Sequence, residues 1–306
     1  MTKTDYDLVI IGAGPAGLTA GIYAARARMK VLVLEKTVPG GQILVTDWIE
    51  NYPGFPEGIS GYDLAEKMRI QAQDLGLKIE TAEVHSLNLS GELKEIVLKD
   101  SRITAKSLII ASGASPRYLG IGEDRFIGKG VSFCATCDAP FFKEKTVVAV
   151  GGGDTAVQEA IFLTKFAKKV YLVHRRDELR AAKILQERAF ANDKIEMIWD
   201  SVPTGIEGFF GVEGVKIKNV KTNEERTIKA DGCFIWIGIL PNTSFLNDAV
   251  KTDEFGFILA DATMQTSVPG VFAAGDVRDT PLRQISTAVG DAAIAAVCAE
   301  HFIENL

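Results

Sequence analysis

The chain has 306 residues, which is longer than one hydrophobic core usually grows, so its length predicts two domains. Its composition, 47% hydrophobic and 24% charged, is that of an ordinary globular protein and argues against a disordered chain. A net charge of −6 argues against nucleic acid or an anionic membrane as the main partner, because both are bound by basic surfaces.

The N-terminal segment predicts a βαβ unit. Residues 7–11 (DLVII) form a continuous apolar run, followed by a glycine turn at 12–17 (GAGPAG), an apolar-rich helix at 18–27 and a second strand at 30–36 (KVLVLEK). The short polar lead before the first strand lacks a cleavage site and an apolar run of bilayer length. We therefore expect a cytoplasmic protein with no membrane partner.

The same order of elements occurs a second time. Residues 146–150 (TVVAV) lead into GGGDTA at 151–156, an apolar helix at 157–167 and the strand KKVYLVHRR at 168–176. Register supports a duplication, because the second strand ends equally far from the first glycine in both copies. The two copies predict an α/β fold with two Rossmann-like, three-layer dinucleotide-binding domains.

Two further stretches resemble each other and predict where the chain passes between the domains. LIIASGASPR at 108–117 and CFIWIGILPNT at 233–243 are apolar strands that each run into a glycine, two residues and a proline. We therefore expect one domain to be inserted in the other. Domain one is predicted to comprise residues 1–116 and 246–306, and domain two residues 117–245.

Segments outside the two βαβ units are predicted to complete each domain. The tail VFAAGDV at 271–277 and the small-residue helix after it have no glycine fingerprint, so we assign them to domain one. Segments 78–103 and 203–230 are strand-like with polar turns, which predicts a smaller antiparallel sheet beside each parallel one.

Each glycine motif is suited to a nucleotide pyrophosphate. In GxGxxG the first glycine makes a tight turn, the second lets the backbone approach the pyrophosphate, and the third allows helix and strand to pack closely. The helix N-terminus then offers free N–H groups to the phosphates. Because each copy lies between a predicted strand and a predicted helix, we interpret both as dinucleotide sites rather than chance glycine turns.

The two copies differ where the adenosine ribose is expected. Glu35 ends the second strand of the first copy, where a carboxylate accepts hydrogen bonds from ribose hydroxyls and repels a phosphate, which favours FAD or NAD. The second copy has a basic segment there, which can chelate a 2′-phosphate and favours NADP: His174, Arg175, Arg176 and Arg180. The alternative is a solvated basic turn in which Asp177 and Glu178 pair with the arginines.

The stretch FCATCDAPFF at 133–142 places Cys134 and Cys137 around a dipeptide. No further ligands lie at short spacing, which argues against a metal site, and a disulfide across two residues closes too small a loop to stabilise a domain much. A redox-active dithiol is the remaining interpretation. Asp138 is a candidate acid/base beside it, with a turn residue or helix N-cap as the alternative. The other two cysteines are expected in the core: Cys233 and Cys298.

Taken together, the motifs resemble the low-molecular-weight thioredoxin reductases of bacteria over nearly the whole chain. They occur in that family's order: GAGPAG, GGQ at 40–42, ENYPG at 50–54, CATCD at 134–138, GGGDTA, HRRDELR at 174–180, AAGD at 273–276 and RQISTAVGD at 283–291. The resemblance implies NADPH-dependent reduction of the disulfide of thioredoxin, or of a thioredoxin-like protein, through FAD and a CxxC redox-active disulfide. It also implies a homodimer whose NADPH domain is inserted into the FAD domain.

The resemblance further implies which residues form each site. FAD is expected to contact Gly12, Gly14, Gly17, Glu35, Gln42, Asn51, Asp276, Arg283 and Gln284. NADPH is expected to contact Gly151, Gly153, Thr155, Ala156, His174, Arg175, Arg176 and Arg180. Cys137 is expected to face the flavin, Cys134 to attack the substrate disulfide, and Asp138 to act as acid/base. Family members rotate the inserted domain about the two crossing strands, so that dithiol and nicotinamide reach the flavin in turn.

One feature departs from the family pattern. Many members follow CATCD with glycine, where this chain has Ala139 and Pro140, which we expect to stiffen the turn. Two other functions fit the motifs less well. A flavin-dependent dithiol oxidase would need no NADPH, so the basic segment speaks against it. A nucleotide-binding redox sensor would have no use for a complete set of acid, dithiol and two cofactor sites.

Overall fold

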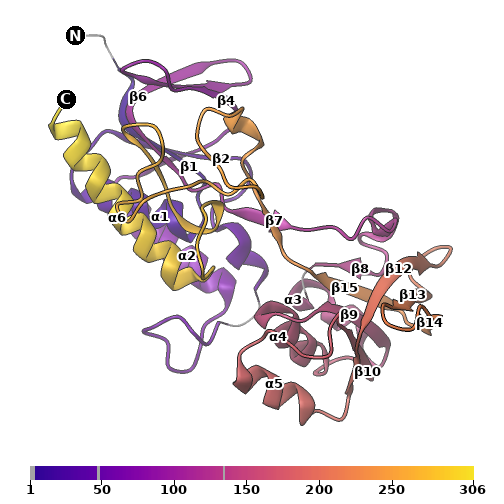
Figure 1. Ribbon diagram of the computed structural model, residues 1–306. Coiled ribbons are helices and arrows are strands. Elements are labelled where there is room, and N and C mark those ends of the chain that lie inside the picture. The colour runs from indigo at the N-terminus through magenta and orange to yellow at the C-terminus, as the bar shows by residue number, and fades with distance from the viewer. Residues whose placement is uncertain (1–3, 47–48, 134) are drawn as a thin grey trace. The chain divides into compact units, whose positions relative to one another are not determined.

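The computed structural model describes residues 4–46, 49–133 and 135–306 (Figure 1). The chain divides into two compact units, Met1–Ser115 with Leu240–Leu306, and Pro116–Ile239. It passes between them through β7 (Ala114–Pro116) and β16 (Ile239–Pro241), which pair as a two-stranded sheet. Both strands follow a glycine with a positive φ, +67° at Gly113 and +120° at Gly238.

The second crossing lies a few residues before the border predicted between residues 245 and 246. The segment after β16 belongs to the first unit, because the Asn242 side chain donates to the Ser112 carbonyl oxygen at 2.9 Å. Phe245 and Leu246, beside and within the 3-10 turn η4 (Ser244–Leu246), pack on the core of that unit. The sequence of this segment does not by itself reveal that it packs on the first unit, because the packing depends on Ser112 and other residues that are distant in the chain.

The first unit is built on a seven-stranded sheet in the order β3-β2-β1-β6-β5-β4, with β17 also paired to β6. The parallel part of this sheet consists of β3, β2, β1, β6 and β17, whereas β5 runs antiparallel to both of its neighbours, β6 and β4. The strands are β1 (Tyr6–Ile11), β2 (Val31–Glu35), β3 (Lys78–Thr81), β4 (Val84–Asn88), β5 (Lys94–Leu98), β6 (Arg102–Ile110) and β17 (Val271–Ala273).

The prediction of a separate small sheet within residues 78–103 is wrong. β3 extends the parallel sheet beside β2, and β4 and β5 continue the same sheet beyond β6. The physical reason is the length of β6. Its N-terminal half pairs with β5, and its C-terminal half pairs with β17, so one long strand serves both partners.

Both faces of this sheet are covered, which explains the continuous apolar sequence of β1. Leu8 and Ile10 lie in one cluster, and Val9 and Ile11 in the other. The first cluster is covered by α1 (Pro15–Arg26), α2 (Gly61–Asp74) and α6 (Ile285–Glu304).

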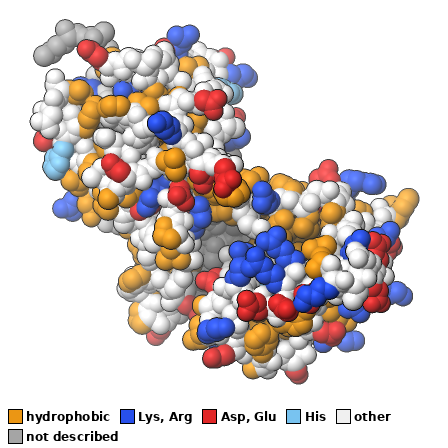
Figure 2. Space-filling model, viewed as in Figure 1, with side chains coloured by type: hydrophobic (Ala, Val, Ile, Leu, Met, Phe, Trp, Pro, Cys, Tyr) orange, Lys and Arg blue, Asp and Glu red, His pale blue; other side chains and the backbone are white. Residues whose placement is uncertain are grey.

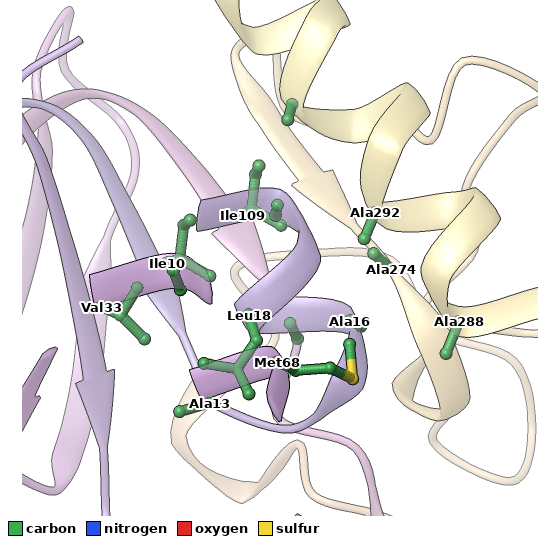
Figure 3. Packing of buried hydrophobic residues seen from close by; sticks show 14 of the residues in the cluster. Ile10, Ala13, Ala16, Leu18, Val33, Met68, Ile109, Ala274, Ala288 and Ala292 are labelled. Atoms are coloured by element: carbon green, nitrogen blue, oxygen red, sulfur yellow. The ribbon is translucent and has the colours of Figure 1, made fainter. Parts of the chain in front are cut away.

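Small residues let the helices of the first unit approach closely. Figure 3 shows Ala288 and Ala292 of α6 in the same cluster as Leu18 of α1 and Ile109 of β6. The helices α1 and α6 pack directly against each other. This packing holds the N-terminus of α1 at the edge where the parallel strands end, which is where a nucleotide site is expected.

The second unit repeats this plan on a five-stranded parallel sheet in the order β11-β10-β9-β15-β8. Its strands are β8 (Val131–Ser132), β9 (Thr146–Gly151), β10 (Lys169–Val173), β11 (Ile195–Ile198) and β15 (Gly232–Trp236). Its helices are α3 (Ala135–Asp138), α4 (Asp154–Leu163) and α5 (Lys183–Phe190). Over both units, the described residues form the 3-10 turns η1 (Gly41–Val45), η2 (Glu123–Phe126), η3 (Ala139–Phe142), η4 and η5 (Gly275–Val277).

A three-stranded antiparallel sheet covers the other face of the second unit. It consists of β12 (Ser201–Glu207), β13 (Gly214–Asn219) and β14 (Glu225–Lys229), and it forms where residues 203–230 were predicted to do so. Val215 and Ile217 of β13 pack on Val148 and Val150 of β9 in one cluster. The predicted α/β fold class with two Rossmann-like domains is confirmed by these two parallel sheets.

Candidate nucleotide and dithiol sites

The first glycine loop needs glycine for steric reasons. Gly12 has a φ of +99°, and a Cβ there would overlap the carbonyl oxygen of Ala111. A Cβ on Gly17 would overlap the carbonyl oxygen of Gly12. These two positions therefore hold the turn between β1 and α1 tight, as the glycine motif predicts.

The N-terminus of α1 is open toward a ligand. Its N-cap is Gly14, which offers no side-chain cap, so the N–H groups of the first turn keep their hydrogen-bonding capacity. Gly41 stands opposite, where an added Cβ would lie 3.0 Å from the Gly14 Cα. The two glycines form a cradle of bare backbone, which fits the close approach of a pyrophosphate to a helix N-terminus.

Glu35 is fixed at the end of β2 by the loop it serves. Its Oε2 accepts from the backbone N–H of Ala13 at 2.8 Å, and its Oε1 accepts from that of Thr37 at 3.0 Å. The carboxylate is thus oriented beside the glycine turn and retains lone pairs for other donors. This is the geometry expected of a carboxylate that receives ribose hydroxyls.

Residues distant in the sequence also meet in the same unit. Asn51 Nδ2 donates to Gln284 Oε1 at 2.8 Å, and Gln284 also caps α6 together with Thr287. The Arg283 guanidinium lies over the Phe257 ring at 4.1 Å, and its buried Nε has no hydrogen-bond partner among the described residues. An unpartnered buried donor of this kind fits a site that a ligand completes.

Asp276 lies in η5 within the AAGD motif. Burial raises the pKa of its carboxyl, the nearby Arg283 guanidinium opposes this rise, and Asp291 adds to it. The last predicted residue of this unit, Gln42, lies exposed in η1. Predicted FAD residues therefore come from both chain segments of one unit.

A buried ion pair that the sequence analysis did not predict holds the AAGD loop. Arg278 Nε donates to Asp291 Oδ2 at 2.7 Å and its Nη2 to Oδ1 at 3.1 Å, and both side chains are nearly buried. Asp291 Oδ2 also accepts from the backbone N–H of Gly275 at 3.2 Å. The available signal was an acid that stands alone in the small and apolar stretch 285–299, a position where a lone charge needs a partner.

The second glycine loop repeats the design of the first. Gly151 has a φ of +147°, and an added Cβ would lie 2.6 Å from the Cβ of Ala156. Gly153 is the N-cap of α4 without a side-chain cap, and it faces open space. Thr155 is exposed in the first turn of that helix. The loop is therefore open to a second dinucleotide.

The basic segment is clamped to this loop. The backbone N–H of Arg180 donates to the Gly152 carbonyl oxygen at 2.7 Å. The His174 ring lies against Gly152, where a Cβ would overlap it, and its buried Nε2 has no partner within the described part of the chain. Burial lowers the pKa of His174, and the neighbouring Arg180 lowers it further, so the ring is neutral at pH 7.

The three arginines of the segment are exposed and available. Among residues 4–46, 49–133 and 135–306, none of Arg175, Arg176 and Arg180 forms an ion pair. Asp177, which could have paired with them, instead meets Lys221 Nζ at 3.0 Å. Figure 2 shows Lys and Arg side chains gathered on one face of the second unit.

The CxxC segment is described in part. Cys134 lies outside the described residues, and so does the side chain of Cys137, whose backbone belongs to α3. Asp138 ends that short helix half-buried and makes no capping hydrogen bond to the 3-10 turn η3. Its alternative role as an N-cap is therefore not what the side chain does.

The departure at residues 139 and 140 has a packing explanation. Ala139 is fully buried in the core of the second unit, and Pro140 stands at the start of η3, where its fixed φ suits the turn. The indole of Trp236 donates to the Phe133 carbonyl oxygen at 3.0 Å just before α3. Both contacts hold the segment to the sheet.

An open cavity of about 440 Å³ adjoins this segment within the second unit. Its lining includes Asp138, Phe141, Lys129, Gly211 and Val212. Asp138, which follows Cys137 in the chain, can therefore be reached from solvent through this cavity.

The remaining cysteines are structural, as predicted. Cys233 is fully buried, and burial raises the pKa of its thiol to about 12, so it does not ionise near neutral pH. Cys298 packs on the core of the first unit, and burial raises the pKa of its thiol as well.

In the described part of the chain, no three His, Cys, Asp or Glu residues gather as metal ligands. No helix there combines the length and apolar character that a bilayer crossing requires.

One chain thus contains two glycine-loop nucleotide folds and α3, which follows Cys134 in the sequence, includes Cys137 and is called the CxxC helix. This combination defines a dinucleotide-dependent disulfide oxidoreductase. The model of the pyridine nucleotide-disulphide oxidoreductase family matches residues 6–292, and the chain belongs to this family.

The chain is similar to several named members. It is 46% identical over 306 residues to the thioredoxin reductase of Peptoclostridium acidaminophilum, which covers 98% of this chain and 97% of that relative. It is 45% identical over 305 residues to the thioredoxin reductase of Treponema pallidum, with 99% of both covered. The crystal structure of Lactococcus lactis thioredoxin reductase matches with a TM-score of 0.96 at 47% identity, over 99% of this chain and 100% of that one.

Proposed function

We propose that this chain is an NADPH-dependent thioredoxin-disulfide reductase that uses FAD and its CxxC pair. The observation that carries the proposal is the contrast between its two nucleotide folds. Glu35 ends β2 of the first fold, whereas β10 of the second fold is followed by three arginines that form no ion pair with a described residue. The second fold also contains the CxxC helix. Similarity over nearly the whole chain to named thioredoxin reductases supports the choice of substrate.

FAD is assigned to the first unit. There the bare backbone of Gly12, Gly14 and Gly17 receives the pyrophosphate at the start of α1, and Glu35 accepts hydrogen bonds from ribose hydroxyls. The other contacts are assigned to Gln42, Asn51, Asp276, Arg283 and Gln284. The Asn51–Gln284 hydrogen bond supports this set, because it brings two of the proposed FAD-contacting residues into direct contact.

NADPH is assigned to the second unit. The loop of Gly151 and Gly153, with Thr155 and Ala156 at the start of α4, receives the pyrophosphate. A 2′-phosphate binds to the basic segment, His174, Arg175, Arg176 and Arg180. The absence of an acidic partner for these arginines among the described residues supports a phosphate as their ligand.

Bound FAD and NADPH supply the hydride acceptor and donor from which the CxxC disulfide receives two electrons. The protein's own chemistry is then thiol–disulfide exchange. The Cys134 thiolate attacks one sulfur of the thioredoxin disulfide, which forms a mixed disulfide and releases the other sulfur as a thiolate. Asp138 gives that thiolate a proton. The Cys137 thiolate next attacks the Cys134 sulfur, which re-forms the intramolecular disulfide and releases the reduced substrate.

Two organisational features accompany the proposal. The dithiol and the arginine segment belong to the same unit, and the dithiol and the nicotinamide must both reach one flavin. We therefore propose that this unit turns about β7 and β16, so that each of them faces the flavin in turn. We also propose that the protein is a homodimer in the cytoplasm. The reducing conditions of that compartment keep Cys233 and Cys298 as thiols.

The test is reduction of oxidised thioredoxin by the purified protein, followed by loss of NADPH absorbance. Turnover with NADPH well above that with NADH is expected. The variants Cys134→Ser and Cys137→Ser should lose thioredoxin reduction while NADPH still bleaches the flavin, and Cys298→Ser is the matched control. No turnover with any thioredoxin contradicts the proposal. Peroxide formation from a small dithiol without NADPH would instead indicate a dithiol oxidase.

A further inference from the structure

The three most exposed large hydrophobic side chains in the described part of the chain are all phenylalanines of the second unit. Phe210, Phe209 and Phe141 are 85%, 82% and 72% exposed. Scattered single exposures are ordinary on protein surfaces. Two adjacent exposed rings on one loop, with a third beside a cavity, form a feature that the fold does not require.

Phe209 and Phe210 are displayed by a built loop, the turn between β12 and β13. Their rings meet edge to face, with centroids 4.8 Å apart. The backbone N–H of Glu213 donates to the Glu207 carbonyl oxygen at 2.8 Å and closes the base of the loop. Gly208, before the pair, has no room for a side chain because a Cβ there would overlap a backbone carbonyl across the loop. The two rings are thus held outward.

The same loop is anchored to the rim of the cavity beside the CxxC helix. Val212 is buried, and its backbone N–H donates to the Lys129 carbonyl oxygen at 3.0 Å. Val212, Gly211 and Lys129 line that cavity together with Asp138 and Phe141. The phenylalanine pair and the residue that follows Cys137 are therefore joined by one continuous surface of the second unit.

We propose that the Phe209–Phe210 pair is an anchor for the oxidised thioredoxin-like protein substrate. This inference rests on the proposed function and names a specificity-determining contact for it. A protein that covers the cavity brings its disulfide to the CxxC helix and reaches the pair at the same time, whereas a small disulfide reaches only the helix. Aromatic side chains bury roughly 150–250 Å² each, so Phe141, Phe209 and Phe210 supply more than half of the about 800 Å² that one partner contributes to a standard interface.

The charges of the cavity favour apolar contact as the anchor. Two lysines, Lys129 and Lys145, and two acids, Asp138 and Asp231, line it, so its net charge is close to zero. Electrostatic attraction to one sign of partner is therefore weak, and aromatic contacts carry the affinity. A partner of this kind presents an apolar rim around its disulfide.

The test compares a protein and a small disulfide as substrates of the FAD-loaded enzyme. The variant Phe209→Ser/Phe210→Ser should raise the KM for oxidised thioredoxin about tenfold with kcat little changed, since aromatic anchors dominate interface affinity. Its kcat/KM for 5,5′-dithiobis(2-nitrobenzoic acid) should equal that of the wild type. Phe255→Ser, which removes a 62% exposed ring from the first unit, is the matched control and should change neither value.

Each other outcome has a distinct meaning. If the wild type reduces thioredoxin and the double variant does so with unchanged KM, the inference is overturned while the proposed function stands. If the double variant changes only the oligomeric state in analytical ultracentrifugation, the pair contacts a second copy of the chain and the inference is again overturned. If the wild type reduces the small disulfide but no thioredoxin, the proposed function itself fails.

Discussion

The Arg278–Asp291 ion pair allows a sharp test of how the first unit holds its proposed FAD site. The variant Asp291→Asn keeps the shape of the side chain but removes the charge that faces Arg278 at 2.7 Å. Only 14% of the Arg278 and 11% of the Asp291 side chain is exposed, so solvent compensates little for the loss. Breaking a buried pair by removing one partner costs about 3–5 kcal/mol, and the remaining amide oxygen keeps part of it, so we expect about 3 kcal/mol.

The measurement is urea unfolding of the apoprotein, with flavin content of the purified protein as a second readout. Flavin content should fall as well, because Asp291 also receives the Gly275 backbone N–H beside Asp276. Asp7→Asn is the matched control. Its pair with Lys106 has the same 2.7 Å separation, but the two side chains are 28% and 36% exposed, so we expect less than about 1 kcal/mol. Equal costs for the two variants would refute the argument from burial.

Two further predictions concern the second unit. Lys221 pairs with Asp177 at 3.0 Å and Asp200 at 2.9 Å, so Lys221→Ala frees Asp177 to compete for the arginines and should lower the NADPH/NADH ratio of kcat/KM about threefold. Adding Asp177→Asn should restore most of that ratio, and Lys216→Ala in β13, the strand before Lys221, should leave it unchanged; a double variant no better than Lys221→Ala alone would mean that the pairing is irrelevant. Burial lowers the pKa of His174 in the folded state below the ordinary histidine value of about 6.5. Near and below that pH the unfolded chain therefore binds more protons at this residue than the folded chain does. Stability from the neutral ring is present above that pH and lost as pH falls below it, so unfolding curves of His174→Gln should depend less on pH between 7 and 5 than those of the wild type.

The nucleotide folds were predictable because their signals are local. Gly12 and Gly151 occupy backbone positions where a side chain does not fit, and the apolar strands before them alternate between two covered sheet faces. A tight turn, an apolar strand and a helix start within one short segment depend on that segment alone. Glu35 also needed no distant information, since it ends the next strand of the same βαβ segment.

Tertiary structure decided the features that join distant segments. The Asn51–Gln284 hydrogen bond links residues 233 positions apart, and the Asp177–Lys221 pair spans 44. Which acid meets which base depends on how the strands and turns are placed, so the sequence left open whether Asp177 neutralised the arginines. The same reason underlies the error over β3, because strand pairing is a choice among edges that are distant in the chain.

The display of Phe209 and Phe210 belongs to the second kind of information. In the sequence they are two apolar residues between glycines, which burial in a core would explain equally well. Their exposure follows from the loop closure between Glu207 and Glu213 and from the anchoring of Val212 against Lys129. The sequence determines that a side chain is apolar, but only the residues packed around it in the tertiary structure determine whether it faces the core or a partner.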